Sequence, residues 1–176
     1  MTDVSSAASG ATSPRQSTFA SISVVLPAYN EAGNLPSTLA DLTAQLPSMS
    51  PHWEVVVVDD GSRDETALVM QPWVRQYGVR YVQLSRNFGK EAALSAGIDH
   101  AHGDVVILMD ADGQHPVDLL PDLLTAWREG ADMVCAVRAS RDDESWSKRL
   151  GTALFYRIVN AGSKVTIPEN ASDFRL

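Results

Sequence analysis

The chain of 176 residues lacks the features that mark several classes of protein. It contains one cysteine, which excludes an intramolecular disulfide and a zinc site built from cysteines. That residue, Cys135, lies in an apolar run and is expected to be a buried core thiol. No stretch approaches the roughly 18 uncharged apolar residues that a membrane-spanning helix needs. The Ser/Ala/Thr-rich start has no apolar segment of the kind found in a signal peptide, so residues 1–20 are predicted to be a disordered tail.

Basic residues are also scarce, since 14 Lys and Arg face 22 Asp and Glu, for a net charge of -8. This balance argues against a nucleic-acid partner. The charge is unevenly spread, because residues 1–137 carry a net -10 and residues 138–176 a net +2. The acidic part suits a divalent cation, and the basic end suits phosphates or an anionic membrane surface.

Strand-like and helix-like patterns alternate after residue 20. The strand-like runs are rich in β-branched residues, and the helix-like runs repeat apolar residues at three- and four-residue spacing. Strands are expected at 22–26, 53–58, 79–84, 104–109 and 131–137. Pro72 lies inside one helix-like run and predicts a break there. This alternation predicts an α/β domain with a mainly parallel sheet.

Polar residues follow the first four predicted strands, at the sheet edge where α/β proteins bind ligands. Asp110 and Asp112 come directly after one buried strand and can converge on a hard cation, with Gln114 as a further oxygen ligand. A solvated acidic turn is the alternative. Asp59 and Asp60 follow another buried strand. There Asp59 is favoured as a ligand for a ribose or base, whereas Asp60, Ser62 or Asp64 could cap a helix.

Five segments, taken together and in this order, resemble glycosyltransferase family 2. They are Pro27–Glu31, Val58–Asp64, Ser85–Glu91, Met109–Pro116 and Ser172–Leu176. The likeness covers about residues 20–176 and is strongest to the branch that acts on polyprenyl phosphates, the dolichol-phosphate mannosyltransferases and bactoprenol glucosyltransferases. It implies the GT-A fold, which is Rossmann-like, and a nucleotide-sugar donor such as a UDP- or GDP-hexose. It also implies Mg²⁺ or Mn²⁺ and inverting transfer of a hexose to a lipid phosphate.

The resemblance also implies roles for single residues, carried over by position. It places Pro27, Tyr29, Glu31 and Asp59 around the nucleotide sugar. Asp110 would lie near the ribose, the sugar or the metal, where it counts as both a donor-binding and a catalytic residue. The resemblance gives Arg86 and Lys90 no definite role, and ordinary loop structure explains them equally well.

The remaining implied residues concern the metal and the acceptor. Asp112 and Gln114, with Asp110, would hold the metal, and Arg138 would contact the acceptor phosphate. Asp173 falls where the family has a carboxylate that acts as a base or orients the sugar.

The C-terminal stretch has a different pattern. Residues 146–158 predict an amphipathic helix that carries Lys148, Arg149 and Arg157, which suits either an ordinary surface or a membrane interface. We therefore expect a GT-A core over 21–140. Residues 141–176 are expected to begin an acceptor-side segment that continues, in relatives, to a membrane region. This predicts a cytoplasmic protein at the inner face of the membrane and leaves a homo-oligomer open.

Two other functions remain as alternatives. One is a non-catalytic subunit that binds a nucleotide sugar, and the other is a family-2 transferase with a soluble or polysaccharide acceptor. The absence of a G-x-G-x-x-G segment after the first strand disfavours a dinucleotide oxidoreductase.

Overall fold

The computed structural model describes residues 2–7, 20–113, 117–138 and 171–176. The chain divides into two compact units, a core unit of Ser17–Leu119 and a flanking unit of Met1–Gln16 with Leu120–Leu176. The division falls between Leu119 and Leu120, whereas the sequence pattern placed a boundary near residue 140. Each unit is described separately below.

The core unit contains a parallel sheet of four strands in the order β5-β2-β3-β4. The strands are β2 (Ile22–Ala28), β3 (Trp53–Asp59), β4 (Val79–Gln83) and β5 (Val105–Leu108). β3 is central, and the four valines at 55–58 are fully buried. A run of β-branched residues buried on both faces is typical of a parallel strand covered by helices. The four strands predicted before residue 110 are therefore confirmed.

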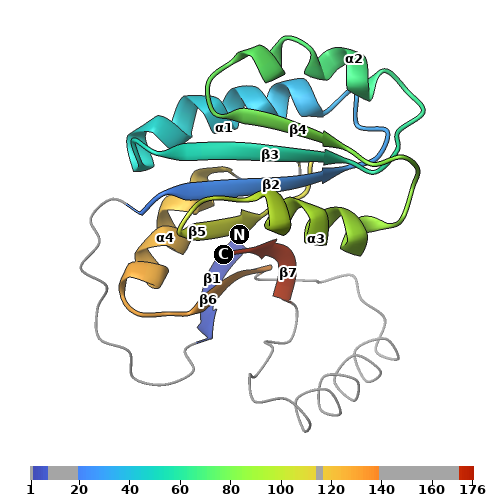
Figure 1. Ribbon diagram of the computed structural model, residues 1–176. Helices are drawn as coiled ribbons and strands as arrows, with labels where there is room; N and C mark the ends of the chain where they lie inside the picture. Colours follow the sequence, from blue (N-terminus) through green and yellow to red (C-terminus); the bar gives the residue numbers. More distant parts are fainter. Residues whose placement is uncertain (1, 8–19, 114–116, 139–170) are drawn as a thin grey trace, which may run out of the picture. The chain divides into compact units, whose positions relative to one another are not determined.

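Helices cover this sheet. They are α1 (Leu35–Met49), α2 (Thr66–Met70), α3 (Lys90–His100) and the short 3₁₀ turns η1 (Trp73–Arg75) and η2 (Val117–Leu119). Figure 1 shows α3 in front of the strands and α1 behind them. α1 buries Leu35, Leu39, Leu42 and Leu46, as its spacing predicts. The predicted break at Pro72 is confirmed, because α2 ends at Met70 and η1 begins at Trp73.

α3 packs very closely on the sheet through Gly97. A Cβ atom added at this glycine would lie 2.2 Å from Cγ1 of Val25, in β2. Alternating strands and helices around a parallel sheet confirm the predicted α/β class.

The flanking unit contains α4 (Leu120–Arg128) and the strands β1 (Thr2–Ala7), β6 (Met133–Arg138) and β7 (Ala171–Arg175). β6 pairs antiparallel with β1 and with β7. The sequence favoured a disordered tail over residues 1–20, whereas residues 2–7 form the strand β1. This weakly apolar segment is ordered by backbone pairing with the apolar strand β6. Cys135, in β6, is 2% exposed, which confirms the buried thiol. The helix predicted at 146–158 lies outside the described residues.

None of the helices in the described ranges is long and apolar enough to cross a membrane.

Candidate functional site

A cavity of about 360 Å³ lies at the carboxyl ends of the parallel strands of the core unit. Its walls come from the segments that follow each strand, as expected for an α/β sheet. Five residues predicted for the site line it together: Pro27, Tyr29, Glu31, Asp110 and Asp112. The others in its wall are Asp60, Asn87, Gly89, Lys90, Ala93 and Ala111.

The loops after β2 and β3 are tied to each other by hydrogen bonds. Asn30, at φ 58°, accepts the N–H of Arg63 on Oδ1 at 2.8 Å, and its own N–H donates to Ser62 Oγ at 2.9 Å. The N–H of Glu31 donates to Thr66 Oγ1 at 3.0 Å. Asparagine tolerates the left-handed conformation better than most residues. These contacts fix the segment that presents Tyr29 and Glu31 to the cavity.

Tyr29 and Glu31 differ in how they are held. Glu31 Oε2 accepts a hydrogen bond from Asn34 Nδ2 at 2.7 Å. Tyr29 is 41% exposed, so its ring is open to a ligand. An exposed aromatic ring can stack on a planar group of a ligand, and a carboxylate beside the ring can accept hydrogen bonds from that group.

Asp59 is fully buried, and protein groups occupy both of its carboxylate oxygens. Oδ1 accepts the N–H of Ser62 at 2.7 Å, and Oδ2 accepts the hydroxyl of Tyr81 and Nε2 of Gln83, the latter at 3.4 Å. Burial, followed by the hydrogen bond to Asp59, raises the pKa of Tyr81, so its hydroxyl stays a donor. Asp59 does not line the cavity, and its role as a donor-binding residue stays a prediction.

Asp60 lies in the cavity wall, and the sequence interpretation had it only as a helix cap. It is 3% exposed, and its two oxygens accept the N–H groups of Phe88 at 2.7 Å and Gly89 at 2.9 Å. These amides directly precede α3, so Asp60 does stabilise a helix N-terminus, that of α3 and not of α2. Asp64 is the residue beside α2, where Oδ1 accepts the N–H of Thr66 at 3.0 Å.

Gly61 allows the loops after β3 and β4 to meet. It has φ +67°, and an added Cβ would lie 2.4 Å from the carbonyl carbon of Arg86. Only glycine combines this conformation with so close an approach of two backbones. The guanidinium of Arg86 lies 4.8 Å from the ring centroid of Phe88, so this cation is occupied within its own loop.

Lys90 and Asp110 form an ion pair inside the cavity wall. Nζ of Lys90, the first residue of α3, lies 2.7 Å from Oδ1 of Asp110, and the two side chains are 39% and 26% exposed. Asp112 lines the same cavity, and Gln114 lies outside the described residues. Within the described ranges, no group of three or more His, Cys, Asp or Glu side chains forms a metal site.

The donor set nevertheless fits a hard divalent cation. Two carboxylates, Asp110 and Asp112, reach one cavity and supply oxygen atoms that one cation can share. Oxygen ligands of this kind suit Mg²⁺ and Mn²⁺.

Arg138 and Asp173 belong to the flanking unit. Arg138 ends β6 and Asp173 lies in the middle of β7, and these two strands pair antiparallel. The structure describes their backbone positions, and their roles stay predictions.

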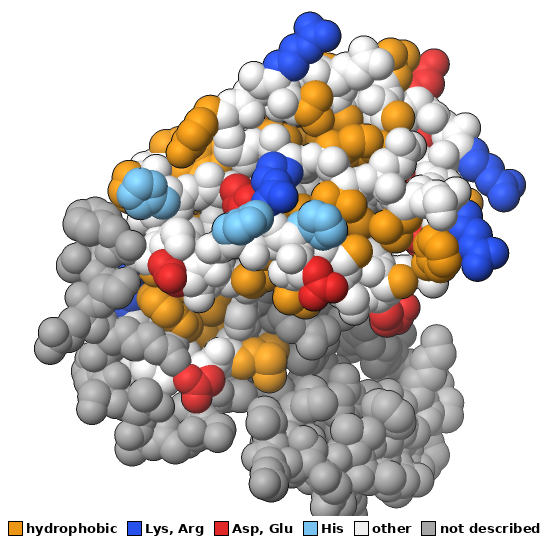
Figure 2. All heavy atoms as spheres, in the orientation of Figure 1, with side chains coloured by type: hydrophobic (Ala, Val, Ile, Leu, Met, Phe, Trp, Pro, Cys, Tyr) orange, Lys and Arg blue, Asp and Glu red, His pale blue; other side chains and the backbone are white. Residues whose placement is uncertain are grey.

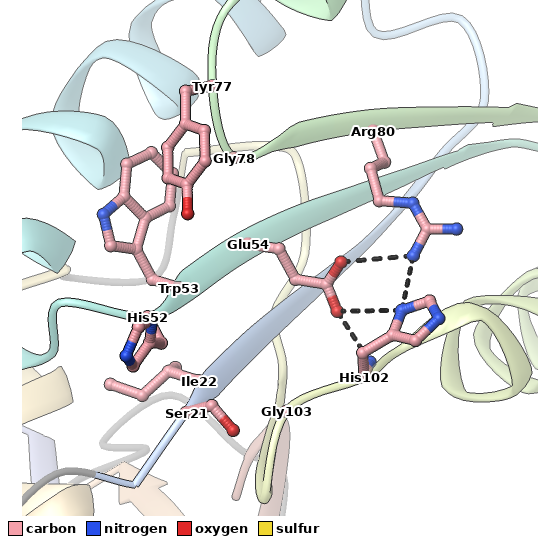
Figure 3. Close-up of a pocket in the computed structure, with 10 residues that line it drawn as sticks. All are labelled: Ser21, Ile22, His52, Trp53, Glu54, Tyr77, Gly78, Arg80, His102 and Gly103. Atoms are coloured by element: carbon pink, nitrogen blue, oxygen red, sulfur yellow. Dashed lines mark hydrogen bonds and ion pairs between the residues drawn. The ribbon is translucent and has the colours of Figure 1, made fainter.

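A second cavity, of about 300 Å³, lies at the amino ends of the same strands (Figure 3). Trp53 meets Tyr77 edge-to-face at 6.3 Å between centroids, and Gly78, at φ +87°, leaves room for the Trp53 ring. Figure 2 shows this face, where histidine side chains gather near a cationic group. The sequence patterns predicted no cavity at this end of the sheet. Its one signal was Glu54, a carboxylate within an otherwise apolar strand.

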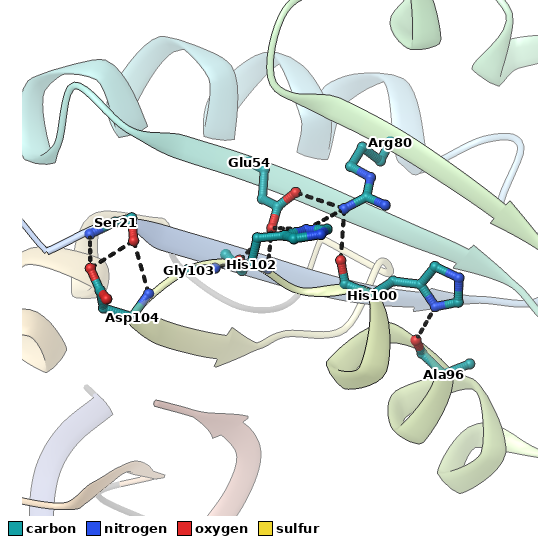
Figure 4. A network of polar contacts seen from close by, with 9 residues as sticks. Ser21, Glu54, Arg80, Ala96, His100, His102, Gly103 and Asp104 are labelled. Atoms are coloured by element: carbon teal, nitrogen blue, oxygen red, sulfur yellow. Dashed lines mark hydrogen bonds and ion pairs between the residues drawn. The ribbon is translucent and has the colours of Figure 1, made fainter.

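Glu54 is the centre of a polar network at this end (Figure 4). It accepts hydrogen bonds from Ser23 Oγ at 2.7 Å, from the N–H of His102 at 2.6 Å and from Arg80 Nη1 at 3.2 Å. Burial alone would raise the pKa of Glu54, but the hydrogen bonds from Ser23, His102 and Arg80, with the charge of Arg80, together hold it below its usual range. The network therefore joins three neighbouring strands and the loop before β5.

Comparison with known proteins decides the family. The sequence model of "Glycosyl transferase family 2" matches residues 23–176. The chain belongs to this family. It is 43% identical over 156 residues to an uncharacterized glycosyltransferase of Synechocystis sp., covering 88% of this chain and 49% of that protein. It is 40% identical over 157 residues to the bactoprenol glucosyl transferase of Shigella phage SfV, covering 88% and 51%.

The fold comparison agrees for this family-2 chain. The mannosyltransferase PcManGT from Pyrobaculum calidifontis, solved with GDP-Man and Mn²⁺, aligns with a TM-score of 0.57 at 27% identity, covering 66% of this chain and 34% of that one. The predicted GT-A fold and family-2 membership are thereby confirmed. The chain spans about half the length of the curated relatives that it matches.

Proposed function

We propose that this chain is the catalytic domain of an inverting glycosyltransferase that moves a hexose from a nucleotide diphosphate to a polyprenyl phosphate, with the donor bound in the core unit. The observation that carries the proposal is the shared cavity of Pro27, Tyr29, Glu31, Asp110 and Asp112 at the carboxyl ends of the strands. The relative named bactoprenol glucosyl transferase supports a lipid phosphate as acceptor.

Different residues of the cavity would bind different parts of the donor. The segment of Pro27, Tyr29 and Glu31 would hold the nucleoside, with the exposed Tyr29 ring stacking on the base and Glu31 accepting a hydrogen bond beside the one from Asn34. Asp110 and Asp112 would lie toward the diphosphate and hold Mg²⁺ or Mn²⁺, with Gln114. The bound metal would supply positive charge that stabilises the leaving diphosphate. PcManGT, which was solved with GDP-Man and Mn²⁺, supports this choice of donor and metal.

The acceptor phosphate is itself the nucleophile. Its second pKa is about 6, so near neutral pH it arrives ionised and needs orientation more than it needs a base. One phosphate oxygen attacks the anomeric carbon as the bond to the nucleotide diphosphate breaks, and a single displacement inverts that centre. We assign Arg138 to the charge of the acceptor phosphate and Asp173 to the orientation of the sugar.

The proposal also places the protein at the inner face of the cytoplasmic membrane, because a polyprenyl phosphate is held in a bilayer. The net positive charge of residues 138–176 and the pattern at 146–158 support contact with anionic lipid.

Two assays test the proposal. A thermal-shift panel of UDP-, GDP- and dTDP-hexoses, with and without Mn²⁺, is expected to show one nucleotide class that raises Tm only with metal. That donor is then incubated with the protein and vesicles that contain undecaprenyl phosphate. The expected product is an undecaprenyl-phosphate hexose with the anomeric configuration inverted, which NMR of the sugar reports.

Three results would contradict the proposal. Donor binding without transfer would favour a non-catalytic binding subunit. Transfer only to a soluble acceptor would exclude a lipid phosphate as the acceptor. Retention of the anomeric configuration would exclude single displacement.

A further inference from the structure

Lys90 places its ammonium group beside a carboxylate of the donor cavity. Its Nζ lies 2.7 Å from Oδ1 of Asp110, and both residues line that cavity with Asp112. No definite role for Lys90 follows from the sequence, since an ordinary loop lysine would explain it equally well.

The backbone at Lys90 is held in place by the residues just before it. It is the first residue of α3, and the amides of Phe88 and Gly89 just before it bind the buried carboxylate of Asp60. The backbone that carries the Lys90 side chain is therefore held at the start of α3. The ion pair between Lys90 and Asp110 therefore forms from an anchored helix start.

An ammonium group and a divalent cation compete for one carboxylate oxygen. Both are hard cations that seek the same lone pairs, and each raises the electrostatic cost of the other nearby. The ion pair must open, or shift to another anion, before a metal can take Oδ1 of Asp110. A donor diphosphate brings new negative charge into the same cavity and gives the ammonium a second partner.

We infer that Lys90 is a positioning residue that occupies the cation position at Asp110 and so makes tight binding of the metal depend on the nucleotide diphosphate. Lys90 weakens binding of the free cation and strengthens the coupling between cation and nucleotide. The inference rests on the proposed function in one respect, that this cavity binds a divalent cation.

The first measurement is the Kd of the chain for Mn²⁺ alone, from the EPR signal of free Mn²⁺. Lys90→Met is expected to tighten Mn²⁺ binding by about tenfold, because it removes a competing positive charge within a few ångströms. Lys90→Arg keeps the charge and is expected to stay within about twofold of wild type. Arg86→Met is the matched control, since it removes a cation that contacts Phe88 and not Asp110. It is also expected to stay within about twofold.

The second measurement is the coupling itself. The Kd values for UDP and for GDP are determined separately, with and without saturating Mn²⁺. The factor by which Mn²⁺ tightens nucleotide binding is expected to be several-fold smaller in Lys90→Met than in wild type. Binding linkage makes this factor equal to the factor by which saturating nucleotide tightens Mn²⁺ binding, so a repeat of the EPR titration with saturating nucleotide checks it.

Each alternative result has a definite meaning. Equal Mn²⁺ affinity in wild type and Lys90→Met, or the same tightening in Arg86→Met, would overturn the role of Lys90 and leave the proposed function standing. Absence of Mn²⁺ binding in all variants, with or without nucleotide, would overturn both this inference and the metal in the proposed function. A Tm measured for each variant shows that the fold is retained.

Discussion

Asp59 and Asp60 are neighbours in the chain with different surroundings. Asp59 is enclosed by Ser62, Tyr81 and Gln83, whereas Asp60 faces the cavity and binds the amides before α3. The sequence could predict that carboxylates at the end of a buried strand need partners. It could not predict which of the two is enclosed, because Tyr81 and Gln83 at Asp59 and the amides bound by Asp60 come from β4 and the loop after it, more than 20 residues away.

At Asp112, the substitution Asp112→Asn removes a charge from the cavity and leaves the core untouched. We expect the Tm increase that a nucleotide sugar causes with Mn²⁺ to be lost, and the Tm of the free protein to stay within a few degrees. Asp118→Asn, at an exposed aspartate outside the cavity, is the control. A metal-dependent Tm increase as large as that of wild type would show that Asp112 is not a ligand.

The hydroxyl of Tyr81 is a donor to a fully buried carboxylate. Tyr81→Phe leaves Asp59 Oδ2 with one long hydrogen bond, from Gln83 at 3.4 Å. We expect the free energy of unfolding to fall by about 1–3 kcal/mol, as measured by urea titration. The control is Tyr77→Phe, at a ring that is 79% exposed, with an expected change below about 0.5 kcal/mol. Equal effects of the two substitutions would contradict the importance of the Asp59 contact.

At the scale of elements, apolar patterns predicted the strands of the core unit to within a few residues. They worked because each strand carries its own signal, a β-branched run buried on both faces. β1 carries no such signal, since its order comes from pairing with β6. The cavity edge was also predictable, because the carboxyl ends of parallel strands meet on one side. The cavity at the amino ends of the strands could not be predicted, because the packing of aromatic rings over Gly78 leaves no periodic pattern in the sequence.

The contact between α3 and β2 depends on the absence of a side chain at Gly97. Alanine there would favour the helix by about 1 kcal/mol. Its Cβ, however, would lie 2.2 Å from Val25 Cγ1, and overpacking of this kind costs about 1–3 kcal/mol. We expect Gly97→Ala to lower the unfolding free energy in urea, whereas Ser95→Ala, on the exposed face of α3, raises it slightly. Stabilisation by Gly97→Ala would mean that α3 can move off the sheet at little cost.

The Glu54 network predicts a dependence of stability on pH. The pKa of Glu54 in the folded chain lies below its usual value of 4.5. Stability from this carboxylate is therefore present above pH 4.5 and is lost as the pH falls through the folded pKa.

We expect Glu54→Gln to reduce the difference in unfolding free energy between pH 7 and about pH 3.5. The reduction should be below about 1 kcal/mol, because the group is partly exposed. Glu65→Gln, at an exposed glutamate, should leave the difference unchanged. An acid dependence in Glu54→Gln identical to wild type would assign it to other groups, such as Asp64 and Asp104, whose pKa values are also lowered.

For the whole molecule, the negative charge is concentrated in the core unit, whose residues 17–119 hold 5 Lys and Arg against 13 Asp and Glu. The acidic core unit holds the cavity with Asp110 and Asp112, and residues 138–176 carry a net positive charge. This distribution of charge could be read from the sequence because charge needs no folding to be counted. The pairing of β6 with β7, which places Arg138 and Asp173 on adjacent strands, needed the structure.

The positive charge of residues 138–176 predicts weak, reversible binding to anionic vesicles. We expect co-sedimentation with phosphatidylglycerol vesicles at low salt and its loss as the ionic strength rises to about 0.5 M, where the Debye length is only a few ångströms. Neutral phosphatidylcholine vesicles serve as the control. Binding that ignores both salt and lipid charge would contradict an electrostatic contact.

Cys135 is a native thiol probe for the opening of β6. The chain has no other thiol, and this one is 2% exposed, so a thiol reagent such as DTNB reacts only when the strand opens. Under native conditions the labelling rate then reports the free energy of that opening without any engineered probe. A donor and Mn²⁺ bound by the core unit would lower the labelling rate of Cys135 only if their binding also stabilises β6 against opening. The same reaction in one cuvette would therefore measure whether the two units open together or one at a time.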